Sequence, residues 1–391
     1  MKLVRHPSRD FFLLLSTRSV RAFAFGFSAV TVAIHLQARG LTATQIGVAL
    51  AIGIATGSLS GLALAAIAAR IGRRLAISLC GLLMVIAGLD LALAHSTWLL
   101  ILAGVTGMLG LSTDLGPFAS VEQAALTDTV PERRRNRAFA RYSALGALAA
   151  AAGSLAAGIA QRNTGAGYAV FAGLGAVTVV LPLLLSTKVE APQAGGPVFG
   201  DLRPLAGLAA LFCLDAFGGG LVANAVIVFW LHVRFGASLG ILGPAFAGLA
   251  LVQAASYEAA GRLGDRFGLI NTMVFTHLPS NLLLIVLPFS PSLWVALGLL
   301  LVQFSLSEMD VPTRQAYIVS IVPPSERAGA VASTGALRGI AQAFGPILAG
   351  AAIQAARLGL PFIVGGGVKA AYDLMLYAAF RNRKAEHETR I

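Results

Sequence analysis

Long apolar runs recur along the whole chain, and they limit what it can fold into more than any other feature. Each run holds about twenty residues, the length that an α-helix needs to cross ~30 Å of hydrocarbon. Short polar turns separate the runs, for example at residues 39–42 and 290–292. We therefore expect twelve membrane-spanning helices, at residues 11–36, 43–68, 75–95, 98–126, 138–160, 167–187, 204–233, 238–260, 269–290, 292–322, 328–353 and 359–380.

The composition also indicates a membrane protein built from helices. Of the 391 residues, 57% are hydrophobic and 12% are charged, which leaves too few polar side chains to cover a soluble protein of this size. The sequence contains no Walker, GxSxG or HExxH motif, so we expect no enzymatic activity, no metal site and no cofactor beyond a proton gradient. Cys80 and Cys213 lie inside apolar runs, and we expect free thiols.

The basic residues are distributed unevenly between the two sides of the predicted membrane. With the N-terminus in the cytoplasm, most Lys and Arg residues between the runs fall on the cytoplasmic side, and Arg39, Arg162, Arg234 and Arg357 fall outside. This bias predicts cytoplasmic termini in a bacterial inner membrane. It also accounts for most of the net charge of +12, so we expect a lipid bilayer as partner and no nucleic acid.

The two halves of the chain repeat each other. Gln123 and Gln315 lie 192 positions apart (315 minus 123), and further Gly, Pro and Arg residues match at the same spacing. The pairs are Gly26 and Gly218, Pro131 and Pro323, Arg135 and Arg327, Gly153 and Gly345, and Gly158 and Gly350. A parallel repeat favours two six-helix bundles with a site between them near the midplane. We place the bundles at residues 1–187 and 204–391, joined by a cytoplasmic linker at 188–203.

Together, the twelve helices, the repeat, the basic loop after the second helix and the central linker resemble the major facilitator superfamily of secondary transporters. The superfamily's loop signature, G-x-L-x-D-R-x-G-R-R, appears at residues 261–268, whereas in the first half Ala69 replaces the Asp. Its Gly-Pro motif is found at Gly345-Pro346 but not at Gly153-Ser154. The resemblance implies a major facilitator fold and a cytoplasmic gate, with candidate gate residues Arg70, Arg73, Arg74, Asp265 and Arg266.

In this superfamily helices 1, 4, 7 and 10 line a central cavity, and most of the intramembrane charges of this chain fall on those four. At 1.5 Å per residue, Arg21, Asp114, Asp215, Glu308 and Asp310 lie roughly 15 to 21 Å from the cytoplasmic helix ends, and thus near mid-membrane. A buried carboxylate that has no fixed cation can carry a proton. Asp114, Asp215 and Glu308 are therefore our proton-coupling candidates.

Other polar groups at similar positions are candidates for binding substrate. They are Arg18, Arg21, Glu122, Gln123, His277, Asp310, Arg314, Gln315 and Arg338. Asp310 and Arg314 are four residues apart and can pair along one helix. The competing interpretation is a set of static ion pairs, Arg21 with Asp215 and Arg314 with Asp310 or Glu122. His277 can be either a hydrogen-bonded packing residue or a proton relay.

The sequence thus predicts a monomeric, proton-coupled transporter that works by alternating access. Export of a small amphipathic or toxic compound is the first hypothesis for its function. Transport of a small anion is the second, and transport of a divalent metal cation is the third. From a different class, the same fold can serve as a membrane receptor that transports nothing.

Overall fold

The computed structural model describes residues 9–109, 117–130, 135–190, 206–307, 309–310, 314, 317 and 327–380. Over these residues, helices occupy all twelve predicted spans, and no strand is present. The helices are α1 (Arg9–Ala38), α2 (Ala43–Ile71), α3 (Arg73–Leu93), α4 (Thr97–Leu102), η1 (Ala103–Thr106), α5 (Pro117–Thr129), α6 (Arg135–Ile159), η3 (Ala160–Arg162), α7 (Thr164–Leu183), η4 (Thr187–Glu190), α8 (Ala206–Leu221), α9 (Asn224–Phe235), α10 (Leu239–Phe267), α11 (Leu269–Val286), η6 (Leu287–Phe289), α12 (Leu293–Ser307), α14 (Arg327–Gln354) and α15 (Leu360–Phe380).

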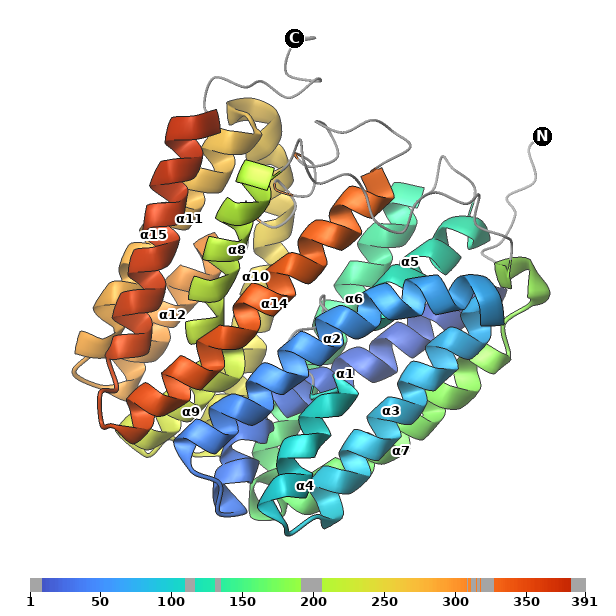
Figure 1. Cartoon of the computed structure of the whole chain (residues 1–391), viewed down its shortest axis with the longest axis horizontal. Helices are drawn as coiled ribbons and strands as arrows, with labels where there is room; N and C mark the ends of the chain where they lie inside the picture. The colour runs from blue at the N-terminus through green and yellow to red at the C-terminus, as the bar shows by residue number, and fades with distance from the viewer. Residues whose placement is uncertain are drawn as a thin grey trace.

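The helices form two bundles, and both chain ends lie at the same end of the molecule (Figure 1). Helices α1 to α7 make the N-terminal bundle, and α8 to α15 make the C-terminal bundle. Residues 188–190 of the predicted linker belong to the short helix η4, whereas residues 191–205 lie outside the described residues. The proposed linker boundaries therefore stay a prediction.

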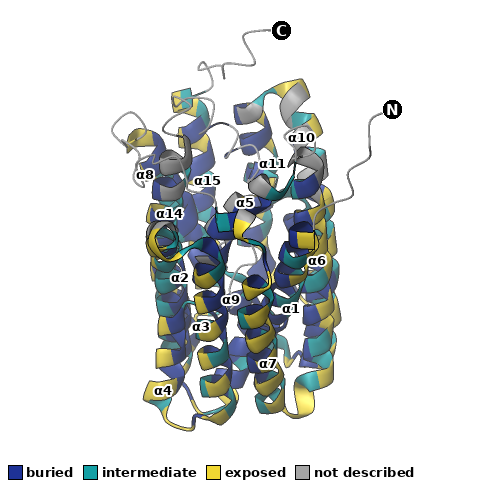
Figure 2. Ribbon diagram, turned by 90° about the vertical axis from the view of Figure 1, so that its right-hand side faces the viewer, coloured by how far each residue is buried: buried dark blue, intermediate teal, exposed yellow. Residues whose placement is uncertain are grey.

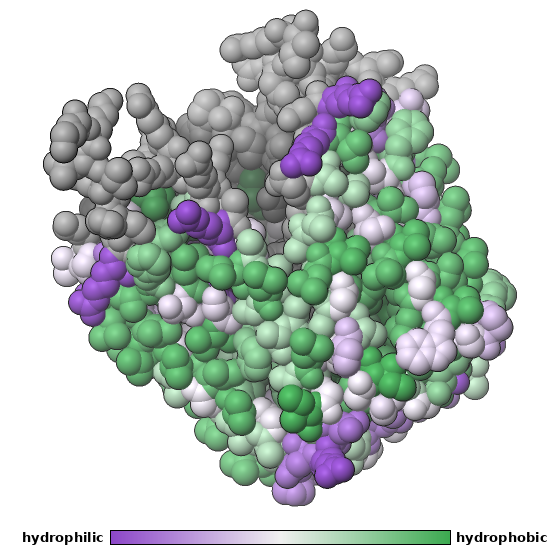
Figure 3. Space-filling view, turned by 180° about the vertical axis from the view of Figure 1, so that it is seen from behind, coloured by the Kyte–Doolittle hydropathy of each residue, from purple (hydrophilic) through white to green (hydrophobic). Residues whose placement is uncertain are grey.

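The surface between the two ends is apolar, as a lipid-facing surface requires. Within the described part of the chain, nine segments are long and apolar enough to cross a membrane. Exposed residues face outwards along the helices (Figure 2), and hydrophobic side chains cover most of the face seen in Figure 3. Large side chains such as Trp98, Phe289 and Trp294 are 70% exposed or more. Aromatic residues of this kind are typical of membrane–water interfaces.

Two of the predicted spans are broken, which the apolar pattern did not indicate. In the fourth span, α4 passes through η1 to Gly107, and residues 107–109 are not helical; α5 begins at Pro117, after residues that lie outside the described set. Gly107 has a φ of +68°, which glycine adopts without the strain that a Cβ imposes. In the seventh span, α8 ends at Leu221 and α9 begins at Asn224. Both spans belong to the set that was expected to line a central cavity.

Glycines set the helix crossings within each bundle, and equivalent glycines do so in both. A Cβ at Gly153 of α6 would lie 1.9 Å from the carbonyl oxygen of Phe23 in α1. A Cβ at Gly345 of α14 would lie 2.2 Å from the carbonyl carbon of Gly220 in α8. Helix backbones approach this closely in membranes only where residues are small. Gly153 and Gly345 are a matched pair of the sequence repeat, so the repeat extends to helix packing.

The two bundles contact each other near the end remote from the termini, again in equivalent ways. A Cβ at Gly47 of α2 would lie 2.2 Å from the oxygen of Pro346, and one at Gly243 of α10 would lie 2.7 Å from the oxygen of Ser154. Ser154 and Pro346 differ by the repeat spacing of 192 (346 minus 154). Further contacts there include the Thr44 amide, which donates to Gln354 Oε1 at 3.0 Å.

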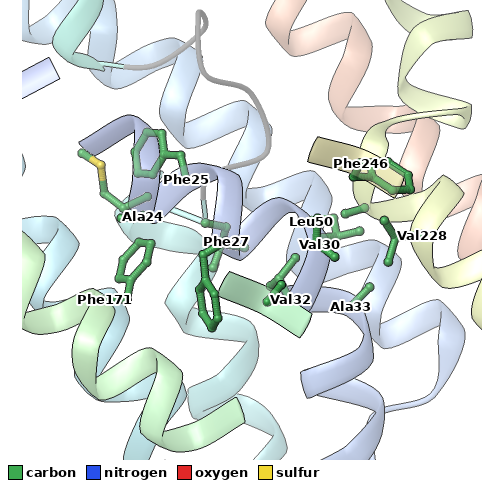
Figure 4. Packing of buried hydrophobic residues seen from close by; sticks show 14 of the residues in the cluster. Ala24, Phe25, Phe27, Val30, Val32, Ala33, Leu50, Phe171, Val228 and Phe246 are labelled. Carbon is green, nitrogen blue, oxygen red and sulfur yellow. The ribbon is translucent and has the colours of Figure 1, made fainter. Parts of the chain in front are cut away.

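The hydrophobic core is continuous across this contact between the bundles. One cluster of buried side chains contains Val30 of α1 and Leu50 of α2 together with Val228 of α9 and Phe246 of α10. Figure 4 shows these residues lying together where the bundles meet. Dense apolar packing holds the two bundles together at this end.

Candidate functional site

In the N-terminal bundle, a buried ion pair joins three helices. Arg21 of α1 donates to Glu122 Oε2 of α5 at 2.6 Å, and the Tyr142 hydroxyl of α6 donates to the same oxygen. Arg21 is 1% exposed and Glu122 is fully buried. The guanidinium also lies over the rings of Phe118, at 4.6 Å, and Phe25, at 5.8 Å. Cation, carboxylate and aromatic faces thus share one enclosed site.

Arg18 lies one turn before Arg21 and faces the same tyrosine. Its guanidinium carbon is 4.9 Å from the centre of the Tyr142 ring. A Cβ at Gly146 would lie 2.5 Å from Arg18 Nε, so this glycine makes room for the side chain. Arg18 is 3% exposed.

In the C-terminal bundle, four basic side chains surround Asp215 of α8. Lys369 Nζ of α15 lies 2.7 Å from Asp215 Oδ1, and Arg338 Nη2 of α14 lies 3.2 Å from Oδ2. Arg314 Nη1 is 3.6 Å from Oδ2, and His277 Nε2 of α11 is 3.7 Å from Oδ1. Arg314 also donates to Asp310, four residues before it.

His277 connects Asp215 to a second carboxylate. Its Nδ1 lies 2.8 Å from Asp373 Oδ1 of α15, and Asn281 Nδ2 donates to Asp373 Oδ2 at 2.8 Å. The side chains of His277 and Asp373 are 2% and 1% exposed. We name the seven residues Asp215, His277, Asp310, Arg314, Arg338, Lys369 and Asp373 the Asp215 cluster.

Comparison with known proteins identifies the family. The sequence model of the Major Facilitator Superfamily matches residues 14–214 and 208–391, nearly the whole chain. The chain belongs to the major facilitator superfamily. This confirms the resemblance noted in the sequence, and with it the major facilitator fold.

The relatives agree with this assignment. The chain is 23% identical to "Uncharacterized membrane protein YJR124C" of Saccharomyces cerevisiae (strain ATCC 204508 / S288c), over 95% of this chain and 94% of that one. Among solved structures, the nucleoside transporter NupG is similar with a TM-score of 0.75 at 14% identity, covering 96% of this chain and 100% of that chain. The D-xylose-proton symporter is similar with a TM-score of 0.67 at 15% identity, covering 94% and 97%.

The superfamily's cavity pattern predicted only part of these contacts. Arg21 and Glu122 meet in one bundle, and Asp215, His277, Asp310, Arg314 and Arg338 meet in the other. Gln123 is exposed on α5. Asp114, Glu308 and Gln315 lie outside the described residues, so their roles stay predictions.

Two expectations about Asp215 are wrong. It was chosen as a carboxylate without a fixed cation, yet Lys369, Arg338 and Arg314 all lie within 4.0 Å of it. The alternative pairing of Asp215 with Arg21 also fails, because Arg21 pairs with Glu122 inside its own bundle. The expected pair of Asp310 with Arg314 is confirmed.

The sequence interpretation also missed several residues of the site. Lys369 and Asp373 are four residues apart in the last apolar run, a spacing that places them on one helix face. The signal was present in the sequence, but both residues lie outside the four helices that line the cavity in the superfamily. Tyr142 and Asn281 carry no such signal, because an isolated Tyr or Asn in an apolar helix is common.

The expected gate residues are arranged differently in the two bundles. Glu190 of η4 accepts hydrogen bonds from the backbone amides of Arg73, at 2.6 Å, and Arg74, at 3.3 Å. The Arg73 guanidinium donates to the Val189 carbonyl at 3.1 Å. A carboxylate at a helix N-terminus satisfies free amides and complements the helix dipole. Glu190, which follows α7, therefore binds the start of α3. This is the half of the chain whose loop signature has Ala69 in place of the Asp.

The remaining gate residues show fewer contacts. Arg70 is exposed at the end of α2, and Arg266 is exposed on α10 with its guanidinium 5.2 Å from the centre of the Phe267 ring. Asp265 lies in α10, but its side chain is outside the described set. Its gating role stays a prediction.

Proposed function

We propose that the protein is a proton-coupled secondary transporter that moves a small molecule by alternating access. The observation that carries this proposal is the Asp215 cluster, a group of buried charges inside a membrane-spanning bundle. Charged residues in the membrane are costly and mark substrate or proton pathways by default. A static scaffold gains little from such a cluster, because apolar packing often replaces buried ion pairs at no loss of stability.

The arrangement of the bundles supports the alternating-access part of the proposal. The contacts at Gly47, Gly243 and Thr44 seal the end remote from the termini. With the termini in the cytoplasm, as the basic residues predict, the sealed end faces outwards. A state in which this end is closed is one of the two that alternating access requires.

We further propose that the substrate is a partly apolar compound. The support is the mixed character of the site around Arg21, where two aromatic rings and a paired guanidinium lie together. Such a site suits a ligand with an apolar body and one polar group. The fold of the D-xylose-proton symporter is compatible with proton coupling, but at this identity it supports the fold alone.

A flux assay tests this proposal. Proteoliposomes containing the purified protein are given ethidium, carboxyfluorescein, inorganic phosphate or manganese(II), with and without an imposed pH gradient. We expect at least one probe to move against its own gradient, and a protonophore to stop it. Probes that bind in a thermal-shift assay but never move would instead identify a receptor. Reversing the pH gradient separates exchange for protons from joint movement with them.

A further inference from the structure

We propose that Arg338 and Lys369 bind one anionic group of the substrate, that His277 takes up the accompanying proton, and that Asp215 links the two events. This inference rests on the proposed function and names the class of its substrate: a small molecule with a single negative charge, such as a monocarboxylate. It makes the anion, the second hypothesis from the sequence, the favoured one.

The balance of charge in the Asp215 cluster is the first reason. Among the residues that the structure describes, three permanent cations, Arg314, Arg338 and Lys369, face three carboxylates, Asp215, Asp310 and Asp373. These six charges cancel while His277 is neutral. A proton on His277 adds one uncompensated positive charge, which is costly away from water. A monoanion cancels that charge, so proton and anion each favour the binding of the other.

The position of His277 is the second reason. Its Nδ1 is bound to Asp373 at 2.8 Å, while its Nε2 faces Asp215 Oδ1 at 3.7 Å, beyond hydrogen-bond distance. A protonated imidazole donates from both nitrogens. Protonation therefore draws the Asp215 carboxylate towards His277. Lys369, which shares Oδ1 with His277, and Arg338, on Oδ2, then each lose part of their partner.

Arg338 is the cation that gains most from a new anion. Its side chain is 19% exposed, against 11% for Lys369 and 6% for Arg314. Its Nη2 has one hydrogen bond, to Asp215 at 3.2 Å, and its Nε is buried without a hydrogen-bond partner. Nε and an Nη together form the fork that binds a carboxylate through two parallel bonds.

The helix that carries Arg338 leaves space beside it. Gly335 lies three residues earlier, on the same face of α14, and a Cβ there would meet nothing within 4 Å. Lys369 lies at the far side of Asp215, and a Cβ at Gly219 would be 3.9 Å from its Nζ. Small residues thus lie beside both cations, and the open space at Gly335 lies next to Arg338.

The surroundings of His277 define what its protonation affects. It faces Asp215 from α8, and Lys369, Tyr372 and Asp373 from α15. Asp310 also acts on it electrostatically. Asn281, on its own helix, lies 3.2 Å from Nδ1. The carboxylates around the imidazole ring favour its protonation, and Lys369 disfavours it. The protonation state of His277 then sets the net charge of the cluster.

A binding experiment on the purified full-length protein tests the proposal. The probes are acetate, lactate and benzoate, each compared with its neutral amide, at about pH 6 and about pH 8, on either side of the usual histidine pKa. We expect the acids to raise the melting temperature more at the lower pH, and the amides to have no effect. Arg338→Gln should lose this response, and His277→Gln should show only the weaker high-pH response at both pH values.

Matched controls separate the site from general charge effects. Arg234→Gln removes a cation outside the cluster, whose guanidinium donates to the Ser290 carbonyl, and should keep the full response. Cys213 gives a readout that needs no variant. It is partly exposed and lies in the electrostatic field of Arg338, whereas Cys80 is buried. We expect benzoate, but not benzamide, to slow labelling of Cys213 by a maleimide at the lower pH.

Each outcome of these experiments either supports the proposed anion site or overturns it. A response to the acids that survives in Arg338→Gln, or a pH dependence that survives in His277→Gln, overturns the proposal. An equal rise in melting temperature with acids and amides also overturns it. No rise at all, together with unchanged maleimide labelling of Cys213, overturns it as well. If the wild type still shows proton-driven flux of ethidium, only the anion site fails. If acids bind as expected and no probe is transported, the site stands and the transport function fails.

Discussion

In the described part of the chain, the buried ion pairs that join different helices each lie within one bundle. Arg21 pairs with Glu122 in the N-terminal bundle, and Asp215 pairs with Lys369 and Arg338 in the C-terminal one. Relative movement of the bundles therefore breaks none of these pairs. The cost of separating buried ions does not add to the barrier between conformations.

The Arg21 pair yields a prediction about stability. Glu122→Ala leaves a buried guanidinium without its carboxylate, and we expect a loss of about 3 to 5 kcal/mol. Tyr142→Phe removes one hydrogen bond to the same oxygen and should cost about 1 kcal/mol. Thermal unfolding in detergent measures both.

The double variant Arg21→Met with Glu122→Met is the control for this prediction. It removes both charges and keeps most of the side-chain volume, so it should recover most of the lost stability. A double variant as unstable as Glu122→Ala alone would show that packing, and not the buried charge, decides stability here.

At the residue scale, the sequence predicted which groups are charged and buried, and the pair of Asp310 with Arg314 along one helix, but not the partners on other helices. The depth of Asp215 along its helix could be estimated, because rise per residue is fixed. Its partners depend on the rotation and crossing of five helices, which apolar composition does not encode. Lys369 was visible as a charge within a span, yet its contact with Asp215 followed only from the packing.

At the scale of helices, matched glycines lie at equivalent helix crossings in the two bundles. The crossings of α1 with α6 and of α8 with α14 use matched glycines, Gly153 and Gly345. The sequence predicted the spans well, because hydrocarbon thickness dictates their length. It did not predict the breaks at Gly107 and after Leu221, because the residues there remain apolar or small.

A glycine substitution tests the crossing of α8 and α14. Gly345→Ala places a Cβ 2.2 Å from a backbone atom of Gly220, which cannot move aside like a side chain. We expect a loss of about 1 to 3 kcal/mol from overpacking, measured by thermal unfolding. Gly298→Ala in α12, where a Cβ would meet nothing within 4 Å, should be neutral or slightly stabilising. Equal effects of the two substitutions would contradict the close crossing.

For the whole molecule, the decisive feature is the contact between bundles at the end remote from the termini. It joins α2 to α14 and α6 to α10 through equivalent residues. Alternating access requires this contact to open when the opposite end closes. Holding it shut should therefore stop transport without disturbing either bundle.

A cross-link at this contact tests that expectation. Thr44 and Gln354 face each other across the two bundles. Thr44→Cys with Gln354→Cys, joined by oxidation or a short bis-maleimide, should stop the flux of any transported probe. Reduction of the disulfide should restore it. Thr44→Cys alone, treated in the same way, should remain active, and continued flux in the cross-linked protein would show that this contact does not open.

The matched contacts of the two bundles also show what the two halves have in common. Gly153 and Gly345 are the same residue at matched positions, and a larger residue at either would separate two helices. The carboxylate and cations around Asp215 have no counterpart in the contacts of Arg21 and Glu122. The two halves thus share their helix crossings and differ in their buried charges. Exchanging the first half with that of a related protein should therefore transfer the scaffold and leave the ionic specificity with the second.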